Sequence, residues 1–192
     1  MADPVLHLIA GPNGAGKSTL YERVIRPVTR LEFVNADVIA AHEWPDDAAA
    51  HAYDASRLAA ERRDQLLAVG TSFVTETVFS HESKLELVKA ATAAGYLVTL
   101  HVVLVPEELA VARVVNRVAN DGHHVPEEKV RSRYARLWPL VAEAITLVDE
   151  ARVYDNSSAA KPFRLVAAFE RGMAASRPAW PRWTLKPLRA AG

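Results

Sequence analysis

The sequence contains no cysteine and no excess of charge of either sign, and both absences limit what the protein can be. None of the 192 residues is Cys, which excludes disulfides, thiolate zinc sites and cysteine nucleophiles, and fits a reducing compartment such as the cytoplasm. Lys plus Arg and Asp plus Glu both number 23, so the chain as a whole has no basic field to attract nucleic acid or an anionic membrane. Any cationic patch must therefore be local.

Long hydrophobic runs are also missing. The longest strongly apolar run, residues 96–105, is interrupted by Thr99 and His101 and is too short to cross a bilayer. The first predicted strand begins within four residues of the N-terminus, with no basic region before it, so we expect no signal peptide. No repeat, low-complexity segment or linker divides the chain. We therefore expect one domain over residues 1–192, of a size that can bury its own core.

A pattern typical of a phosphate-binding loop follows a short apolar segment near the start of the chain. Two glycines separated by four residues are followed directly by Lys and Ser, between a predicted strand and a predicted helix. Glycines let the backbone turn its N–H groups inward around an anion, and the helix adds its positive N-terminal end. Lys17 would reach the β- and γ-phosphates, and the Ser18 hydroxyl would bind Mg²⁺. The residues predicted to bind ATP are Gly11, Pro12, Asn13, Gly14, Ala15, Gly16, Lys17, Ser18 and Thr19.

Predicted strands and helices alternate along the chain. The strands cover residues 5–10, 31–34, 72–75, 96–105, 151–154 and 163–169. The helices cover residues 17–25, 38–42, 46–69, 82–94, 107–119 and 126–150. We expect Pro27 to stop the first helix, Pro139 to kink or end the last, and the tail from residue 177, with Trp180 and Trp183, to pack back on the domain or on a partner. The alternation predicts a three-layer α/β fold, with a central parallel sheet and helices on both faces.

Acidic residues follow three predicted strands, where a parallel sheet delivers ligand-binding groups to one edge. Asp37 lies soon after the phosphate-binding loop, so it is our candidate for the base that takes a proton from an acceptor hydroxyl. Capping of the short helix over residues 38–42 is the alternative role, and one residue can do both. Glu76 is our candidate for holding or orienting the acceptor, although a lone Glu at a strand end is often only a solvated group. Asp155 follows the strand over residues 151–154.

Arginines are concentrated in one part of this neutral chain. Five occur between residues 113 and 136, namely Arg113, Arg117, Arg131, Arg133 and Arg136. Charged helix faces are usually just solvated, and that interpretation applies here too. We favour a small helical, arginine-bearing lid over residues 107–138, because phosphate recognition is where clustered arginines are physically useful. Arg117, Arg133 and Arg136 are the residues that we expect to close over the phosphates.

These features favour phosphoryl transfer, which needs a phosphate cradle, Mg²⁺, cations over the migrating group and an oriented hydroxyl. The loop is also typical of transporter-type ATPases, but the chain has no Leu-Ser-Gly-Gly-Gln signature and no run of four apolar residues ending in Asp-Glu. Two other interpretations stay open: a non-catalytic nucleotide-binding switch, and a kinase of another small metabolite or of nucleic-acid ends. The neutral overall charge argues against nucleic acid as a partner.

Several short motifs occur in a fixed order along residues 5–157. Besides the phosphate-binding loop they are Asn35-Ala36-Asp37-Val38-Ile39, Glu76-Thr77, Arg-Val-x-x-Arg-Val at 113–118, Gly122-His123-His124-Val125-Pro126, Arg131-x-Arg133-Tyr134 and Tyr154-Asp155-Asn156-Ser157. With these motifs the chain resembles the zeta-toxin family of P-loop kinases, specifically its short members. The resemblance implies an adenylate-kinase-like domain that uses ATP and Mg²⁺ to phosphorylate UDP-N-acetylglucosamine on the sugar, with Asp37 as catalytic base. It also implies a toxin whose ATP site is blocked by a small antitoxin protein.

The resemblance also implies roles for individual residues. On this basis we expect Arg113 to contact ATP, and Asn35, Glu76, Thr77 and His123 to contact the substrate. Longer members have an extended insert for the sugar nucleotide and an arginine in the lid where His123 stands here, a difference that bears on the acceptor more than on the kinase chemistry. His123 and the histidine after it could bind a metal ion, but no third ligand lies at a suitable spacing, so contacts with phosphate or solvent are favoured.

Overall fold

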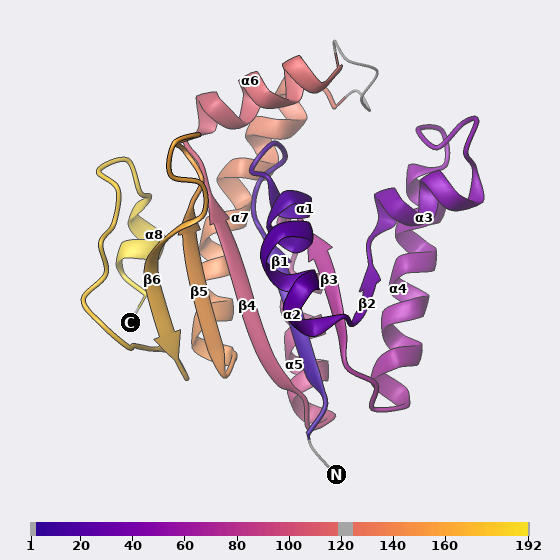
Figure 1. Ribbon diagram of the computed structural model, residues 1–192, viewed down its shortest axis with the longest axis horizontal. Coiled ribbons are helices and arrows are strands. Elements are labelled where there is room, and N and C mark those ends of the chain that lie inside the picture. The colour runs from indigo at the N-terminus through magenta and orange to yellow at the C-terminus, as the bar shows by residue number, and fades with distance from the viewer. Residues whose placement is uncertain (1–2, 119–124, 192) are drawn as a thin grey trace.

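The strands form one mixed sheet that is parallel through most of its width (Figure 1). A computed structural model describes residues 3–118 and 125–191, apart from the side chains of residues 117 and 118. Within these residues the sheet has seven strands in the order β2-β3-β1-β4-β5-β6-β7. The first five pair in parallel, whereas β6 pairs antiparallel with both β5 and β7. The strands are β1 (Val5–Ala10), β2 (Glu32–Val34), β3 (Phe73–Thr77), β4 (Leu97–Leu104), β5 (Glu150–Asp155), β6 (Arg164–Glu170) and β7 (Met173–Ala174).

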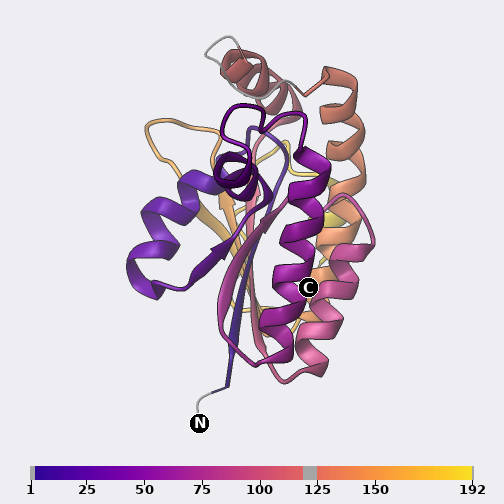
Figure 2. The same cartoon turned by 90° about the vertical axis from the view of Figure 1, so that its right-hand side faces the viewer.

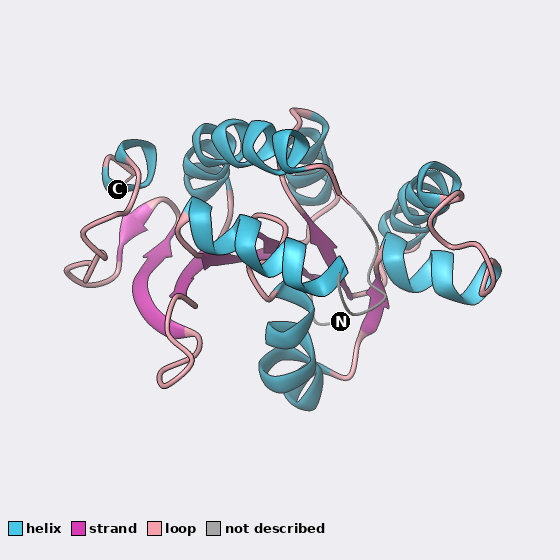
Figure 3. Cartoon of the chain, turned by 90° about the horizontal axis from the view of Figure 1, so that it is seen from above, coloured by secondary structure: helices cyan, strands magenta, loops and turns pink. Residues whose placement is uncertain are grey.

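Helices cover both faces of this sheet, as the alternation of elements predicted. Figure 2 shows the first helical segment on one face and α4, α5 and α7 on the other, and Figure 3 shows α6 lying across the carboxyl edge of the strands. The helices are α1 (Lys17–Leu20), the π-helical turn η1 (Tyr21–Ile25), α2 (Arg26–Thr29), α3 (Ala36–Glu43), α4 (Ala52–Ala68), α5 (Ser83–Ala93), α6 (Glu107–Val118), α7 (Glu127–Leu147) and α8 (Lys186–Arg189). The predicted α/β class with a central parallel sheet is confirmed.

Strand β4 forms the centre of the core. It pairs with β1 on one side and β5 on the other, and its residues from Leu100 to Leu104 are buried, as a nearly continuous apolar run requires. Helix α7 contributes Leu137, Trp138 and Val141, which have no exposed surface. The phosphate-binding loop thus begins at the end of β1, a strand that is paired on both sides within the sheet.

The first helical segment continues past Pro27, so the predicted stop there is wrong. Helix α1 passes into η1, in which the Arg26 N–H donates to the Tyr21 carbonyl five residues back, and α2 then runs to Thr29. This wider turn changes the hydrogen-bond register just before the proline, which lies in the first turn of α2, where a missing N–H costs least. Tyr21 stacks on Phe33 of β2 with ring centroids 3.7 Å apart, which holds the segment on the sheet.

Helix α7 does not end at Pro139. One helix runs from Glu127 to Leu147, with Pro139 in its interior. The buried side chains of Leu137 and Val141, one on either side of the proline, pack both halves of the helix against the same core. This packing outweighs the backbone hydrogen bond that the proline removes.

Helix α4 begins at Ala52, six residues later than predicted. The preceding segment folds into turns in which Trp44 stacks on His51 with ring centroids 4.5 Å apart, and His51 Nδ1 lies 3.2 Å from the Asp54 carboxylate. The predicted stop at Gly70 is confirmed, since Gly70 has a φ of 65° and its N–H donates to the Leu67 carbonyl. Helices α3 and α4 thus form a hairpin beside the edge strand β2.

The C-terminal tail packs back on the domain. Trp180 lies 6.4 Å from Phe169 between ring centroids, Leu188 is fully buried, and the Ala179 N–H donates to the Val166 carbonyl. None of the helices in the described ranges is long and apolar enough to cross a membrane. The single domain over residues 1–192 stays a prediction.

Candidate active site

A cavity of about 660 Å³ opens at the carboxyl edge of the sheet, where the phosphate-binding loop predicts a ligand site. Its walls come from the loop, the start of α3, one face of α4, the segment from the end of β3 to the start of α5, and the inner sides of α6 and α7. Lys17, Asp37 and Glu76 all line it. The topology therefore brings together residues that are up to 59 positions apart in the sequence, because parallel strands end at the same edge.

Helix α6 and the turn after β5 pack closely against the phosphate-binding loop, which explains why two of its positions are glycine. A Cβ on Gly14 would lie 2.5 Å from the Ala110 carbonyl of α6, and one on Gly16 would lie 2.6 Å from Asn156 Nδ2. Both residues also have positive φ angles, 75° and 92°. Any side chain there would force α6 or the turn after β5 away from the loop.

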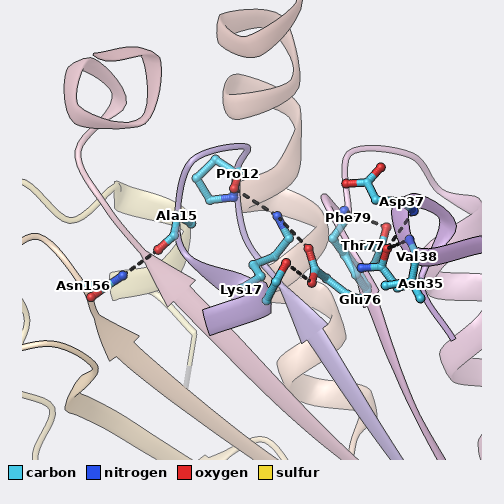
Figure 4. A network of polar contacts seen from close by, with 11 residues as sticks. Pro12, Ala15, Lys17, Asn35, Asp37, Val38, Glu76, Thr77, Phe79 and Asn156 are labelled. Carbon is cyan, nitrogen blue, oxygen red and sulfur yellow. Dashed lines mark hydrogen bonds and ion pairs between the residues drawn. The ribbon is translucent and has the colours of Figure 1, made fainter. Parts of the chain in front are cut away.

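Two side chains hold the loop in place. Asn156 donates from Nδ2 to the Ala15 carbonyl at 2.8 Å (Figure 4). Arg113 of α6 donates to the Asn156 carbonyl at 3.0 Å and to the Gly14 carbonyl at 3.4 Å. Arg113 also lines the cavity, so a nucleotide contact stays a prediction. Sequence reasoning did not assign a role to Asn156, although it lies directly after a strand and within the motif Tyr154-Asp155-Asn156-Ser157.

The Lys and Ser side chains of the loop meet a carboxylate from β3. Lys17 is only 7% exposed; its Nζ donates to the Pro12 carbonyl at 3.1 Å and lies 3.7 Å from Glu76 Oε1. Ser18 donates from its hydroxyl to Glu76 Oε2 at 2.9 Å. Glu76 is therefore not a solvated surface group, since its side chain is 11% exposed and lies against the two loop side chains (Figure 4).

Asn35 caps α3, so the alternative in which Asp37 caps this helix is wrong. The Asn35 side-chain oxygen accepts hydrogen bonds from the N–H groups of Asp37 at 2.7 Å and Val38 at 3.2 Å. This leaves the Asp37 carboxylate without a hydrogen bond or ion pair to any residue that the structure describes, at an exposed position on the cavity wall. Such a carboxylate is available to accept a proton from a ligand.

The ends of β3 and β5 differ in what their polar residues do. Thr77 lines the cavity, and its hydroxyl oxygen accepts the Phe79 N–H at 3.2 Å, which shapes the turn after β3. Asp155 does not line the cavity: it accepts the Ser157 N–H at 2.9 Å and pairs with Arg164 at 3.0 Å. Burial alone would raise the pKa of Asp155, but these hydrogen bonds and the Arg164 charge lower it below its usual range.

The arginines of α7 point to different places. Arg133 is half-buried and lines the cavity, and burial together with the nearby Arg136 charge lowers its pKa. Arg136 is exposed outside the cavity wall and donates to the Ser132 carbonyl of its own helix at 3.2 Å. Arg131 binds both carboxylate oxygens of Glu108, at 2.6 and 2.9 Å, and so joins α7 to α6. The structure thus brings Arg133, but not Arg136, to the site.

Two of the predicted site residues fall outside what the structure describes. Arg117 belongs to α6, but its side chain is not among the described ones, and His123 lies between the described ranges. Their predicted contacts with phosphate and substrate stay predictions.

A phosphate-binding loop after the first strand of a parallel sheet defines a P-loop fold. A family model described as an AAA domain matches residues 6–140, and the chain belongs to this family. This membership, like the loop itself, supports nucleotide binding. A comparison with curated protein sequences found no match.

Solved structures of similar fold include kinases and a toxin–antitoxin system. A chain of the PezAT chromosomal toxin–antitoxin system of Streptococcus pneumoniae has a TM-score of 0.64 and 14% identity, over 88% of this chain and 72% of that chain. A chain of the AvrRxo1-ORF1:-ORF2 structure with ATP has a TM-score of 0.72 and 18% identity, over 91% of this chain but only 60% of that longer chain. A gluconokinase from Sinorhizobium meliloti 1021 has a TM-score of 0.53 and 17% identity, over 85% and 87%.

At these identities the likeness concerns the fold. The predicted resemblance to zeta-toxin-like P-loop kinases is confirmed at that level, since the family model and the solved structures agree on it.

Proposed function

We propose that the protein is a kinase that transfers the γ-phosphoryl group of ATP, with Mg²⁺, to a hydroxyl group of a small molecule. The observation that carries the proposal is one cavity that joins a phosphate-binding loop, the Lys17–Glu76–Ser18 contacts and the Asp37 carboxylate, which pairs with none of the described residues. The similarity in fold to the gluconokinase and to a structure that contains ATP supports it.

Each residue has a role in this reaction. The loop N–H groups and Lys17 bind the β- and γ-phosphates, and Asp37 accepts the proton of the attacking hydroxyl. A new bond forms between the acceptor oxygen and the γ-phosphorus, while the bond from that phosphorus to the bridging oxygen breaks and ADP leaves. Arg133 adds positive charge beside the migrating group. Arg117 and Arg136 would join it if the lid changes position.

The Ser18 hydroxyl and the Glu76 carboxylate fit Mg²⁺. They are hard oxygen donors 2.9 Å apart, and none of the described residues forms a cluster of three or more acidic or His side chains that would make an all-protein metal site. Magnesium in such sites keeps waters and phosphate oxygens as its other ligands. When bound, it neutralises charge on the transferred phosphoryl group.

The acceptor that we propose first is the sugar of a UDP-N-acetyl sugar, with Asn35, Glu76, Thr77 and His123 as its contacts and a zeta-like toxin role in the cytoplasm. The likeness in fold to a chain of the PezAT toxin–antitoxin system supports a toxin with an antitoxin as its partner. Expression of the wild-type chain should then stop bacterial growth, and Lys17→Ala should restore it.

The test of the kinase is transfer of label from γ-labelled ATP to a panel of nucleotide sugars, nucleosides and small alcohols. We expect one acceptor class to be phosphorylated by the wild-type protein. Lys17→Ala should abolish every signal, because the phosphates lose their fixed cation. ATP binding without transfer to any acceptor would instead indicate a nucleotide-binding switch.

A further inference from the structure

Positive charge is concentrated in the cavity of a chain that is neutral overall. Among the described residues that line the cavity, six are Lys or Arg and only two are Asp or Glu. Four of the six belong to the loop and to α6 and α7, where a nucleotide would use them: Lys17, Arg113, Lys129 and Arg133. The other two, Arg63 of α4 and Lys84 of α5, lie in elements that have no part in the loop or in the lid.

The face of α4 that lines the cavity carries mostly small side chains. Ala52, Ser56, Ala59 and Arg63 all line it at spacings of four, three and four residues, which places them on one side of the helix. The first three side chains are small, and the last is a long cation. This stripe runs along about 16 Å of helix axis, so a ligand can lie beside it and meet Arg63 at its end.

Lys84 lines the same cavity as Arg63, from the neighbouring helix α5. Figure 2 shows α4 and α5 on the same face of the sheet, and both side chains are half-buried. Burial lowers the pKa of Lys84, and the Arg63 charge lowers it further. Burial also lowers the pKa of Arg63, despite the opposing charge of Asp64. Two like charges thus lie close together where solvation is reduced, an arrangement that costs free energy unless an anion joins them.

Neither cation has an acidic partner at ion-pair distance. Arg63 and Lys84 make no side-chain hydrogen bond and no ion pair with the part of the chain that the structure describes. Other cations of the same helices are paired: Arg62 binds Glu32 at 2.7 Å, Arg57 binds Glu61 at 2.6 Å and Lys89 binds Glu86 at 3.1 Å. The unpaired cations are therefore the ones that face the cavity.

A hydrogen-bond donor lies on the same wall. His81 lines the cavity, and its Nδ1 accepts the Ser83 N–H at 3.1 Å. When the ring is neutral, this bond places the remaining proton on Nε2, which can then donate to a ligand oxygen.

We propose that Arg63 and Lys84 bind an anionic group of the acceptor, a phosphate or a carboxylate, at a subsite separate from the phosphates of ATP. This inference rests on the proposed kinase function, because the bound molecule is an acceptor only if the protein transfers a phosphoryl group to it. Neutral sugars and simple alcohols are then poor acceptors, because they leave the two cations without a counter-charge.

The test measures binding without turnover. With the loop filled by Mg²⁺ and a non-hydrolysable ATP analogue, inorganic pyrophosphate is titrated calorimetrically into the wild-type protein and variants. Arg63→Gln and Lys84→Gln should each weaken binding about tenfold or more, the loss expected for one charge-assisted contact. Arg57→Gln and Lys89→Gln remove the same charge from exposed, paired positions on the same helices and should stay within about twofold.

A matched set of ligands identifies the anion. N-acetylglucosamine 1-phosphate, glucuronate and N-acetylglucosamine are titrated in the same way, which separates phosphate, carboxylate and neutral groups. Equal binding of the neutral sugar and its phosphate, an equal loss in the control variants, or unchanged pyrophosphate binding in both cavity variants would overturn the proposal. So would a lower melting temperature of ligand-free Arg63→Gln, because removal of a half-buried cation that pairs with none of the described residues should leave stability unchanged or raise it.

The result also separates the subsite from the kinase. Pyrophosphate binding that depends on Arg63, with no acceptor ever phosphorylated, would retain the anion site and reject the kinase. Phosphorylation of a neutral acceptor at full rate by Arg63→Gln would retain the kinase and reject the anion site.

Discussion

Glu76 links the loop to the rest of the cavity. Its two oxygens lie 2.9 Å from the Ser18 hydroxyl and 3.7 Å from Lys17 Nζ, so one carboxylate touches both side chains that a nucleotide would use. A negative charge at this position opposes bare phosphates and favours a phosphate–Mg²⁺ complex.

Glu76→Gln separates these effects. We expect affinity for ADP without Mg²⁺ to stay the same or rise, because the repelling charge is gone, while phosphoryl transfer falls roughly a hundredfold. Calorimetry with and without Mg²⁺ and a transfer assay measure the two quantities. The exposed Glu86, which pairs only with Lys89, supplies the control Glu86→Gln. Full transfer by Glu76→Gln would show that the carboxylate has no role in the reaction.

Helix α6 and the start of α7 share a small apolar cluster beside the cavity. Val111, Val114 and Val130 make a cluster separate from the main core, and Arg131 ties the two helices through Glu108. The remainder of α7 packs into the main core, so a lid movement would be confined to α6 and the first turns of α7. In the arrangement that the structure describes, Arg133 reaches the cavity and Arg136 does not.

This difference predicts unequal effects of two neighbouring substitutions. Arg133→Gln should lower the transfer rate by roughly a hundredfold or more, because a cation beside the migrating phosphoryl group is lost. Arg136→Gln should lower it much less, since its guanidinium contacts only its own helix. Single-turnover rates of the two variants provide the comparison. Equal losses would mean that the lid brings both arginines over the phosphates in the reacting complex.

The centre of the sheet contains a buried polar network. His101 of β4 lies 3.1 Å from His7 of β1 and 3.4 Å from the Tyr154 hydroxyl of β5. Burial, with the charges of His7 and Arg152, lowers the pKa of His101 to about 3, and burial and Arg152 also lower the pKa of His7 despite the opposing Glu150 charge. The folded chain therefore holds His101 neutral.

Stability should consequently depend on pH through His101. In the unfolded chain this histidine takes up a proton near its ordinary pKa of 6.5, and in the folded chain it does not until about 3, so stability is lost as the pH falls through this window. Between about pH 7 and about pH 5, the unfolding free energy of His101→Leu should fall by roughly 1–2 kcal/mol less than that of the wild type. Denaturant titrations at both pH values measure it. The exposed His42 offers the control His42→Gln, which should keep the full dependence, and a full dependence in His101→Leu would contradict the account.

At the scale of the molecule, the fold class and the phosphate-binding loop could be predicted because both depend on short-range patterns in the sequence. The phosphate-binding loop is a contiguous pattern, and the alternation of elements correctly indicates the parallel sheet. The errors lie where tertiary packing decides. Pro27 does not stop the first helical segment, because a π turn precedes it, and Pro139 does not end α7, because buried neighbours surround it, while the predicted kink at Pro139 stays a prediction.

The site was only partly predictable for the same reason. Asp37 and Glu76 could be found because they lie at or shortly after the carboxyl ends of strands, and these ends meet at one edge. The contacts of Glu76 with Ser18 and of Asn156 with Ala15, and the placement of Arg63 and Lys84 in one cavity, join distant parts of the chain. No spacing in the sequence indicates such pairs, which only the packing of α4, α5 and the loop creates.

The central claim is that Asp37 takes the proton of an acceptor hydroxyl in the cavity that both Asp37 and Lys17 line. The most direct measurement is single-turnover phosphoryl transfer by Asp37→Asn, with ATP affinity measured in parallel. The account predicts a loss of about 10² to 10⁴ in rate, the usual contribution of a general base, with ATP affinity within about twofold of the wild type. Transfer at the wild-type rate by Asp37→Asn would contradict it.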